Sequence, residues 1–202
     1  MQTYLHGRDL IGDLDSSKEE VETVLDVAVD LKRRRALNEP RAYLRDTVLA
    51  LCELAQNAPS HKRTWPWRFA LADGDGRARL GNVVADAMEL HGDTAEKVAK
   101  TRTKYLRTPA ILIVGSAAGD SELRTAENRY SVAAGVQNIL LAATAHGLAS
   151  YWSSCPKGAN DATASLCGFG ADTAIVAMIY LGWATDPAQA VPRPDAHLNI
   201  IE

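Results

Sequence analysis

Cysteine is scarce in this sequence, and the three present are too few and too scattered for a disulfide framework. Cys52, Cys155 and Cys167 show neither CxxC spacing nor a cysteine and histidine cluster, so a structural zinc site is not expected. No apolar run approaches the roughly 18 residues that a membrane span needs. Residues 1–15 carry three aspartates and lack the apolar core of a secretory signal, which predicts a cytoplasmic protein without a membrane partner.

A strong charge of one sign is also absent. The 22 basic and 25 acidic residues leave a formal net charge of -3, which gives no general attraction to nucleic acid or to an anionic membrane. The 202 residues, 47% of them hydrophobic, suffice for one globular domain with a sizeable core. We therefore expect an irregular lead-in over residues 1–15 and a single domain over residues 16–202.

The glycine-rich loops that bind nucleotide phosphates are missing. Gly74 and Gly76 are followed by Arg79 where a dinucleotide-binding fingerprint has its third glycine. Gly76 and Gly81 have P-loop spacing, but Asn82 replaces the lysine that contacts the phosphates. No GxSxG or HExxH motif occurs. If the chain is an enzyme, a bound cofactor must supply the chemistry, and we expect neither a catalytic side chain nor a metal site.

Hydrophobic periodicity divides the chain into helices and strands. Helices are expected over residues 17–35, 48–55, 80–90, 93–107, 127–146 and 161–167, and strands over residues 67–72, 110–114, 148–152 and 174–181. The first helix begins with a capping box and ends in a run of basic residues, where cations favour the negative end of the helix dipole. The helix over 127–146 is apolar on most faces, which predicts burial nearly all round. Its small residues suit either a dimer interface or the core of a monomer.

Two loops and a late strand carry most of the remaining signal. Ala58–Lys62 reads APSHK, and PWRF follows at Pro66–Phe69. Ala142–Leu148 reads AATAHGL, and Ile175–Gly182 is an apolar strand that ends in leucine and glycine. With these landmarks in this order over residues 20–194, the chain resembles the nitroreductase family, in its short branch.

The resemblance implies an α+β fold with a mixed central β-sheet flanked by helices. It implies an intertwined homodimer with two active sites between the subunits, FMN as the bound cofactor, and NADH or NADPH as the electron donor. The reaction expected from it is a ping-pong transfer of a hydride through the flavin to a nitroaromatic, a quinone or another small, planar, electron-poor acceptor.

The resemblance also assigns binding residues, position by position. A basic run at the end of the first helix matches the stretch that holds the FMN phosphate and ribityl chain, with arginine at position 35 where a serine is usual. The APSHK loop and the segment that follows the strand over 148–152 match stretches that contact the flavin. The residues expected from the resemblance to contact FMN are Arg33, Arg34, Arg35, Ser60, His61, Trp65, Trp152, Ser153 and Ser154. Arg193, which stands between two prolines and is not part of the resemblance, is expected to add a phosphate contact. The segment expected to contact the nicotinamide nucleotide is Ala142, Ala143, Thr144, Ala145, His146 and Gly147.

One position departs from the family pattern. Trp65 stands where similar proteins have a glutamine whose amide hydrogen-bonds the cofactor, whereas an indole donates one hydrogen bond and accepts none. Trp65 and Trp67 are separated by one proline, so in an extended chain both side chains point to the same side. We expect Trp65 to face the cofactor and Trp67 to pack in the core. Nothing in the sequence lowers the pKa of Cys155, so we expect an inert thiol there.

Two other interpretations stay open. The substitutions at positions 35 and 65 also fit a flavin-binding or sensing protein of the same fold that has lost redox turnover. The basic clusters Lys32–Arg35 and His61–Arg63 fit a helical module that binds nucleic acid or a partner protein, although the net charge argues against it.

Overall fold

The structure is a computed structural model that describes residues 39–184, 186 and 191–201. The chain divides into two compact units, residues 1–49 and residues 50–202. The described part of the first unit is the beginning of helix α2 (Glu39–Ala55), whose first turn holds Pro40. Proline is tolerated there because the first N–H groups of a helix have no partner within it. The predicted first helix and the domain boundary after residue 15 lie outside the described residues, and the boundary stays a prediction.

Helices and strands alternate through the second unit. In order they are the 3-10 turn η2 (His61–Arg63), β1 (Trp67–Asp73), α3 (Gly76–Leu90), α4 (Ala95–Lys104), the 3-10 turn η3 (Tyr105–Arg107), β2 (Ala110–Ser116), α5 (Glu122–Ala145), β3 (Ala149–Ser153), α6 (Asn160–Leu166) and β4 (Ala174–Gly182). Every helix and strand expected from residue 48 onward is present. Helix α3 begins at Gly76 instead of residue 80 because its first turn, with two arginines, has too few large apolar residues to reveal it.

The strands form a sheet in the order β1-β2-β4-β3, and each neighbouring pair is antiparallel. The expectation of a mixed sheet is therefore wrong for the described strands. The helix pair α3 and α4 returns the chain so that β2 runs against β1, and α5 then carries the chain to β3, which runs parallel to β2. Strand β4 enters antiparallel between them, so the parallel strands never become neighbours.

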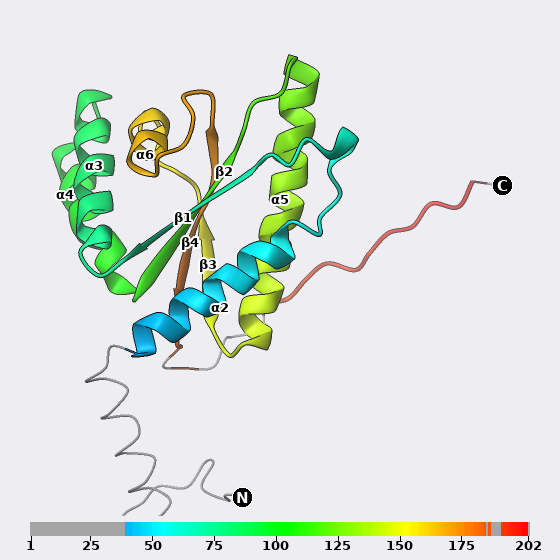
Figure 1. The fold of residues 1–202 in the computed structure, drawn as a ribbon, viewed down its shortest axis with the longest axis horizontal. Helices are drawn as coiled ribbons and strands as arrows, with labels where there is room; N and C mark the ends of the chain where they lie inside the picture. The colour runs from blue at the N-terminus through cyan, green and yellow to red at the C-terminus, as the bar shows by residue number, and fades with distance from the viewer. Residues whose placement is uncertain (1–38, 185, 187–190, 202) are drawn as a thin grey trace, which may run out of the picture. The chain divides into compact units, whose positions relative to one another are not determined.

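The sheet is covered on both faces, which confirms the α+β class. Helices α3, α4 and α6 lie on one face and α5 lies on the other (Figure 1). Every residue of β2 is buried, as its unbroken apolar run predicts for a central strand. Ile111 and Ile113 of β2 join Met178 of β4 and Leu80 and Val84 of α3 in the core beneath the helix pair.

Helix α5 is buried on one side only within the described chain. Val132, Val136 and Ile139 are fully buried, whereas Tyr130 is 73% exposed and Leu141 62% exposed. Burial nearly all round is thus a wrong prediction for one chain, because the sheet and the end of α2 cover one side of this helix and nothing described covers the side that carries Tyr130 and Leu141. Among the described helices, none is both long and apolar enough to cross a membrane.

Candidate functional site

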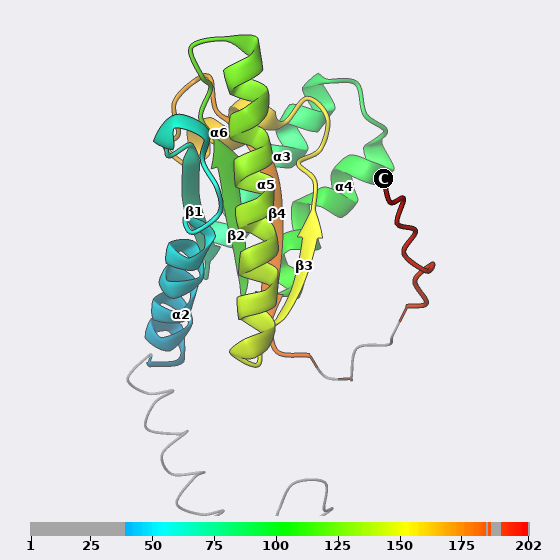
Figure 2. The ribbon, with the colours of Figure 1, turned by 90° about the vertical axis from the view of Figure 1, so that its right-hand side faces the viewer.

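The strand directions bring the predicted flavin-binding segments to one end of the sheet. Because neighbouring strands are antiparallel, the start of β1 and the end of β3 lie at the same end, and α5 begins there too. The two segments lie at opposite edges, because β1 and β3 are the outer strands, roughly 14 Å apart at three strand spacings. Figure 2 shows η2 and β3 on opposite sides of α5.

The loop before β1, residues 58–66, has an unusual backbone. Lys62, Arg63 and Trp65 have φ angles of 54, 53 and 48°, in the left-handed region that non-glycine residues seldom enter. Residues in such sparsely populated regions cost on the order of 1 kcal/mol or more each, and they cluster at binding and catalytic sites. This loop is therefore the segment of the described chain that we single out as the candidate site.

Two polar contacts hold the loop against the start of α5. His61 Nδ1 lies 2.9 Å from Glu127 Oε1. The Thr64 hydroxyl donates to Asn128 Oδ1 at 2.6 Å, and the Asn128 amide donates to the carbonyl of Ala117 at 3.1 Å. The strained backbone is thus supported by side chains that come from about sixty residues further along the chain.

Electrostatics reinforce the contact between His61 and Glu127. The hydrogen bond from His61 is the largest influence on the Glu127 carboxyl and holds its pKa below the usual value; partial desolvation opposes this effect, and the positive charge of Arg124 adds to it. Arg124 also donates to Glu127 Oε2 at 2.6 Å. Glu127 therefore stays ionised at neutral pH and links the loop to its own helix.

The free donors of the loop fit the ring of a flavin nucleotide. Lys62 and Arg63 are exposed, and their side chains make no hydrogen bond or ion pair within the described residues. The Ser60 hydroxyl donates to the Thr64 hydroxyl at 3.2 Å, because the Thr64 proton is used toward Asn128, so Ser60 offers a ligand an acceptor and not a free donor. Exposed cations and donors of this kind suit the pyrimidine edge of an isoalloxazine, which carries carbonyl and nitrogen acceptors and gains electron density during hydride transfer.

Replacing Glu127 tests whether the loop depends on this anchor. Glu127→Gln keeps an acceptor for His61 but removes the charge, so we expect trypsin to cut after Lys62 or Arg63 several-fold faster than in the unchanged chain. Mass spectrometry of the timed digest measures the two cuts. Glu96→Gln, which breaks the exposed ion pair with Lys100 on α4, is the matched control. Equal cutting rates in all three proteins would show that the loop is held by other contacts.

Trp65 does not lie as an extended chain would place it. Its left-handed backbone turns the indole outward, where it is 53% exposed, while Trp67 is 6% exposed. The two ring centroids are 6.2 Å apart with a tilt of 45°. The prediction that Trp67 packs in the core is confirmed, and the shared direction of the two side chains is wrong because residue 65 is not extended. The exposed indole of this loop residue is accessible to a ligand.

Trp152, at the end of β3, already uses its indole N–H. The register between β2 and β4 shifts at residues 114 and 115, which leaves Val176 without a partner across β2. The Trp152 Nε1 donates to the free Val176 carbonyl at 3.2 Å, and the ring is 38% exposed. The Ser153 hydroxyl donates to the Ser154 carbonyl at 3.3 Å. Contact between the flavin and Trp152, Ser153 or Ser154 stays a prediction. Because the indole N–H of Trp152 is already used, that side chain would contact the flavin through its ring face.

The predicted nicotinamide segment forms the end of α5. Gly147 has φ 72°, a conformation that favours glycine, and Leu148 N–H donates to the Ala143 carbonyl at 2.8 Å. This geometry caps the helix, as expected for a glycine at that position. The cap accounts for Gly147, and a role of Ala142–Gly147 in binding NADH or NADPH stays a prediction.

The remaining predicted contacts come from the two ends of the chain. Arg33, Arg34 and Arg35 lie outside the described residues. Arg193 is exposed in a stretch without helix or strand. Their roles in binding the FMN phosphate therefore stay predictions.

The cysteines show no feature of a reactive thiol. Cys52 is buried, and burial raises its pKa to about 12. Burial also raises the pKa of Cys155, whose sulfur lies 3.7 Å from the Thr163 hydroxyl. Within the described ranges no three histidine, cysteine, aspartate or glutamate side chains come together as metal ligands do.

Sequence reasoning missed the residues that support the site. Glu127, Asn128 and Arg124 belong to α5 and gave no signal, because only the fold brings them to a loop that lies more than sixty positions earlier. The bulge opposite Trp152 also had no signal, since β4 is apolar throughout and its register cannot be read from composition.

Comparisons with known proteins give one consistent result. The family model described as "Nitroreductase family" matches residues 17–183. The Escherichia coli (strain K12) protein YdjA, which carries the name NAD(P)H nitroreductase, is 24% identical over 159 residues, or 78% of this chain and 86% of YdjA. A nitroreductase-like protein from Bacillus cereus is 26% identical with a TM-score of 0.64, over 74% of this chain and 80% of that one.

A third relative shares the fold at lower identity. The FMN-dependent nitroreductase NfnB from Mycobacterium smegmatis, solved in complex with NADPH, is 22% identical with a TM-score of 0.58. The match covers 75% of this chain and 85% of that one. The order of helices and strands around the sheet is thus shared well beyond the landmark loops.

Proposed function

The chain belongs to the nitroreductase family, and from this premise we propose that it transfers a hydride from NAD(P)H, through bound FMN, to a small electron-poor acceptor such as a nitroaromatic or a quinone. As a member of the family it is an FMN-dependent NAD(P)H oxidoreductase. The observation that carries the proposal is the family match over residues 17–183, which includes both landmark segments. The supported loop with its free donors adds to it.

FMN, when bound, supplies the redox chemistry by accepting a hydride and passing it on. The residues of the chain bind the flavin and orient its ring. Ser60 and His61 position the ring at the loop, and the positive charges of Lys62 and Arg63 complement electron density that rises on the ring during transfer. Trp65 offers an aromatic face beside it. No side chain needs to act as a nucleophile, which agrees with the absence of such a motif.

Basic residues near the two ends of the chain are proposed to bind the phosphate of FMN. Arg33, Arg34 and Arg35 supply guanidinium groups, which bind a phosphate dianion through paired hydrogen bonds. Arg193 adds a further cation. The segment Ala142–Gly147, proposed to contact the nicotinamide nucleotide, lies at the far end of α5, about 22 Å from Glu127 at 1.5 Å per residue, so within one chain it is not beside the flavin loop. At the other sheet edge, Trp152, Ser153 and Ser154 form the second flavin-contacting surface.

In a homodimer, the loop of residues 58–66 in one subunit can lie next to the end of β3 in the other. Within one chain the loop and the end of β3 lie at opposite edges of the sheet, with the start of α5 between them. The uncovered side of α5 carries Leu123, Tyr130 and Leu141, each more than half exposed, and such a row favours association with another apolar surface. We place each flavin between the loop of one subunit and the β3 end of its partner. Two sites per dimer follow.

The visible spectrum of the purified full chain tests the cofactor. A yellow preparation that releases FMN on denaturation, and that oxidises NADH or NADPH in the presence of a nitroaromatic or a quinone with parallel double-reciprocal plots, is the expected result. Bound FMN without turnover would instead support the flavin-sensing interpretation. A colourless protein that takes up no FMN in a titration would overturn the proposal.

A further inference from the structure

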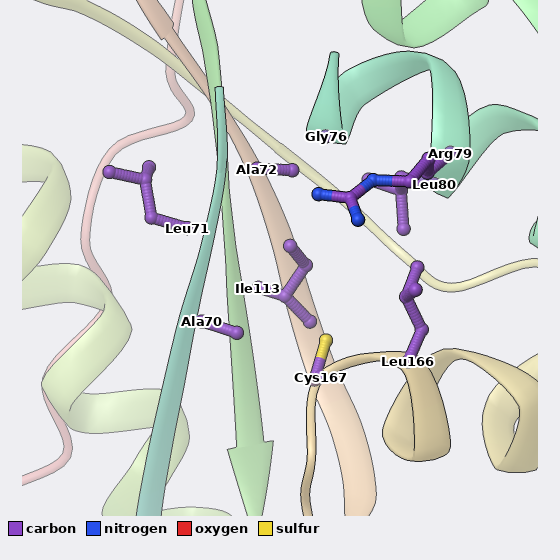
Figure 3. Close-up of a pocket in the computed structure, with 9 residues that line it drawn as sticks. All are labelled: Ala70, Leu71, Ala72, Gly76, Arg79, Leu80, Ile113, Leu166 and Cys167. Atoms are coloured by element: carbon purple, nitrogen blue, oxygen red, sulfur yellow. The ribbon is translucent and has the colours of Figure 1, made fainter. Parts of the chain in front are cut away.

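A hollow on the face of the sheet opposite α5 lies apart from the segments predicted to bind FMN or the nicotinamide nucleotide. It has a volume of about 140 Å³ and lies between β1, the first turn of α3 and the end of α6 (Figure 3). No residue predicted to contact FMN or the nicotinamide nucleotide lines it. The hollow therefore shares no lining residue with the predicted flavin site.

Small side chains create the hollow. Ala72 of β1 faces Gly76 of α3, where an added Cβ would still lie 3.9 Å from the Ala72 Cβ, and Ala70 of β1 also lines the hollow. The strand and helix thus leave a space that larger side chains would fill. Ile113 of β2 and Leu80 of α3 form apolar walls. Leu166, at the end of α6, borders it from the other side and is 41% exposed.

One charged side chain reaches over this apolar space. Figure 3 shows the Arg79 guanidinium extending over the hollow toward Ala72 and Ile113. Arg79 makes no side-chain hydrogen bond or ion pair in the part of the chain that the structure describes, and Asp75, one turn earlier, does not pair with it. Burial raises the pKa of the Cys167 thiol, also on the hollow, to about 11, so that group is neutral and the residues that line the hollow include no anion to pair with Arg79.

We propose that this hollow binds a small monocarboxylate with an aromatic or branched apolar body, whose carboxylate pairs with Arg79. A guanidinium suits a carboxylate because two parallel hydrogen bonds join them. The volume matches a single ring, since a cavity of about 150 Å³ accepts benzene. A phosphate suits the hollow less well, because the lining offers one cation and otherwise apolar groups. The site is separate from FMN binding and does not depend on the proposed function.

Benzoate is the probe, and methyl resonances locate it. In the full chain labelled at isoleucine and leucine methyl groups, a millimolar titration with benzoate is expected to shift the signals of Ile113, Leu80 and Leu166 in a saturable way. The methyl signals of Ile139 and Leu141, on α5, are expected to stay in place. Benzyl alcohol, which keeps the ring without the charge, is expected to bind at least tenfold more weakly, because a hydrogen bond to a charged group is worth about 1.5 to 3 kcal/mol.

Two variants separate the charge of Arg79 from a general effect of charge. The Arg79 side chain is exposed, so the Arg79→Gln variant is expected to fold normally. Its affinity for benzoate is expected to be at least tenfold lower than that of the unchanged protein. Arg107→Gln removes an exposed cation away from the hollow and is expected to leave the affinity unchanged. The proposal is overturned by an absence of shifts at the three methyl groups or by equal affinity in Arg79→Gln. Shifts confined to α5, or identical shifts with inorganic phosphate alone, would overturn it too.

Discussion

Gly135→Val is expected to lower the free energy of unfolding by about 3 kcal/mol. A Cβ at this position of α5 would lie 2.6 Å from Trp67 Nε1 and 2.7 Å from the Ala55 carbonyl oxygen. Both neighbours are buried, and one is backbone, so neither can move aside without moving an element. Overpacking a filled core costs typically about 1 to 3 kcal/mol. Valine adds two methyl groups beyond the Cβ, so we expect a cost at the upper end of this range. The small gain in helix propensity over glycine does not offset it.

Denaturant unfolding measures this effect, with Ala99→Val as the control. Ala99 is exposed on α4, so the same valine there is expected to cost only about 0.5 kcal/mol through helix propensity. A loss at Gly135 no larger than that at Ala99 would mean that α5 shifts freely away from Trp67. Trp67 Nε1 is buried without a hydrogen-bond partner in the described chain, which is consistent with a contact that leaves no room for adjustment.

Arg33→Ala combined with Arg34→Ala is expected to weaken FMN binding at least tenfold. Each guanidinium is proposed to contact the phosphate, and a charged hydrogen bond contributes about 1.5 to 3 kcal/mol. Titration of the apoprotein with FMN, followed by quenching of flavin fluorescence, measures the dissociation constant. Single variants at positions 33, 34 and 35 identify which arginines make the contact.

Arg107→Gln is the control for this titration, because it removes one positive charge at an exposed position outside the proposed phosphate site. Its FMN affinity is expected to equal that of the unchanged protein. If the double variant at positions 33 and 34 also keeps full affinity, the phosphate is bound elsewhere in the chain, and the assignment of the basic run fails.

The sequence predicted the elements well where burial or a turn leaves a local signal. The unbroken apolar run at residues 110–114 is a central strand, and Gly147 ends α5 as expected. Strand order left no such signal. β4 is as apolar as any parallel strand, and only long-range pairing places it antiparallel between β2 and β3. Likewise, the apolar residues of α5 look alike in sequence whether the sheet or a second subunit covers them.

The sequence predicted the loop of the candidate site, but it did not predict the side chains of α5 that hold the loop in place. The APSHK motif located the loop at residues 58–62, but the left-handed backbone of Trp65 contradicts the simple alternation assumed for an extended chain. The contacts to Glu127 and Asn128 depend on where α5 starts relative to β1, which is a tertiary property. Family resemblance supplied the cofactor, which no residue pattern could have identified alone.

The place of β4 in the sheet has a consequence during synthesis. Among the described strands, β3 pairs only with β4, which is the last of them in the chain. At roughly 5–20 residues per second, translation takes on the order of seconds to pass from the end of β3 to the end of β4. Throughout that interval β3 lacks its one neighbour among the described strands. Unpaired strand edges promote aggregation, so a nascent chain that ends before residue 174 is expected to benefit from a chaperone.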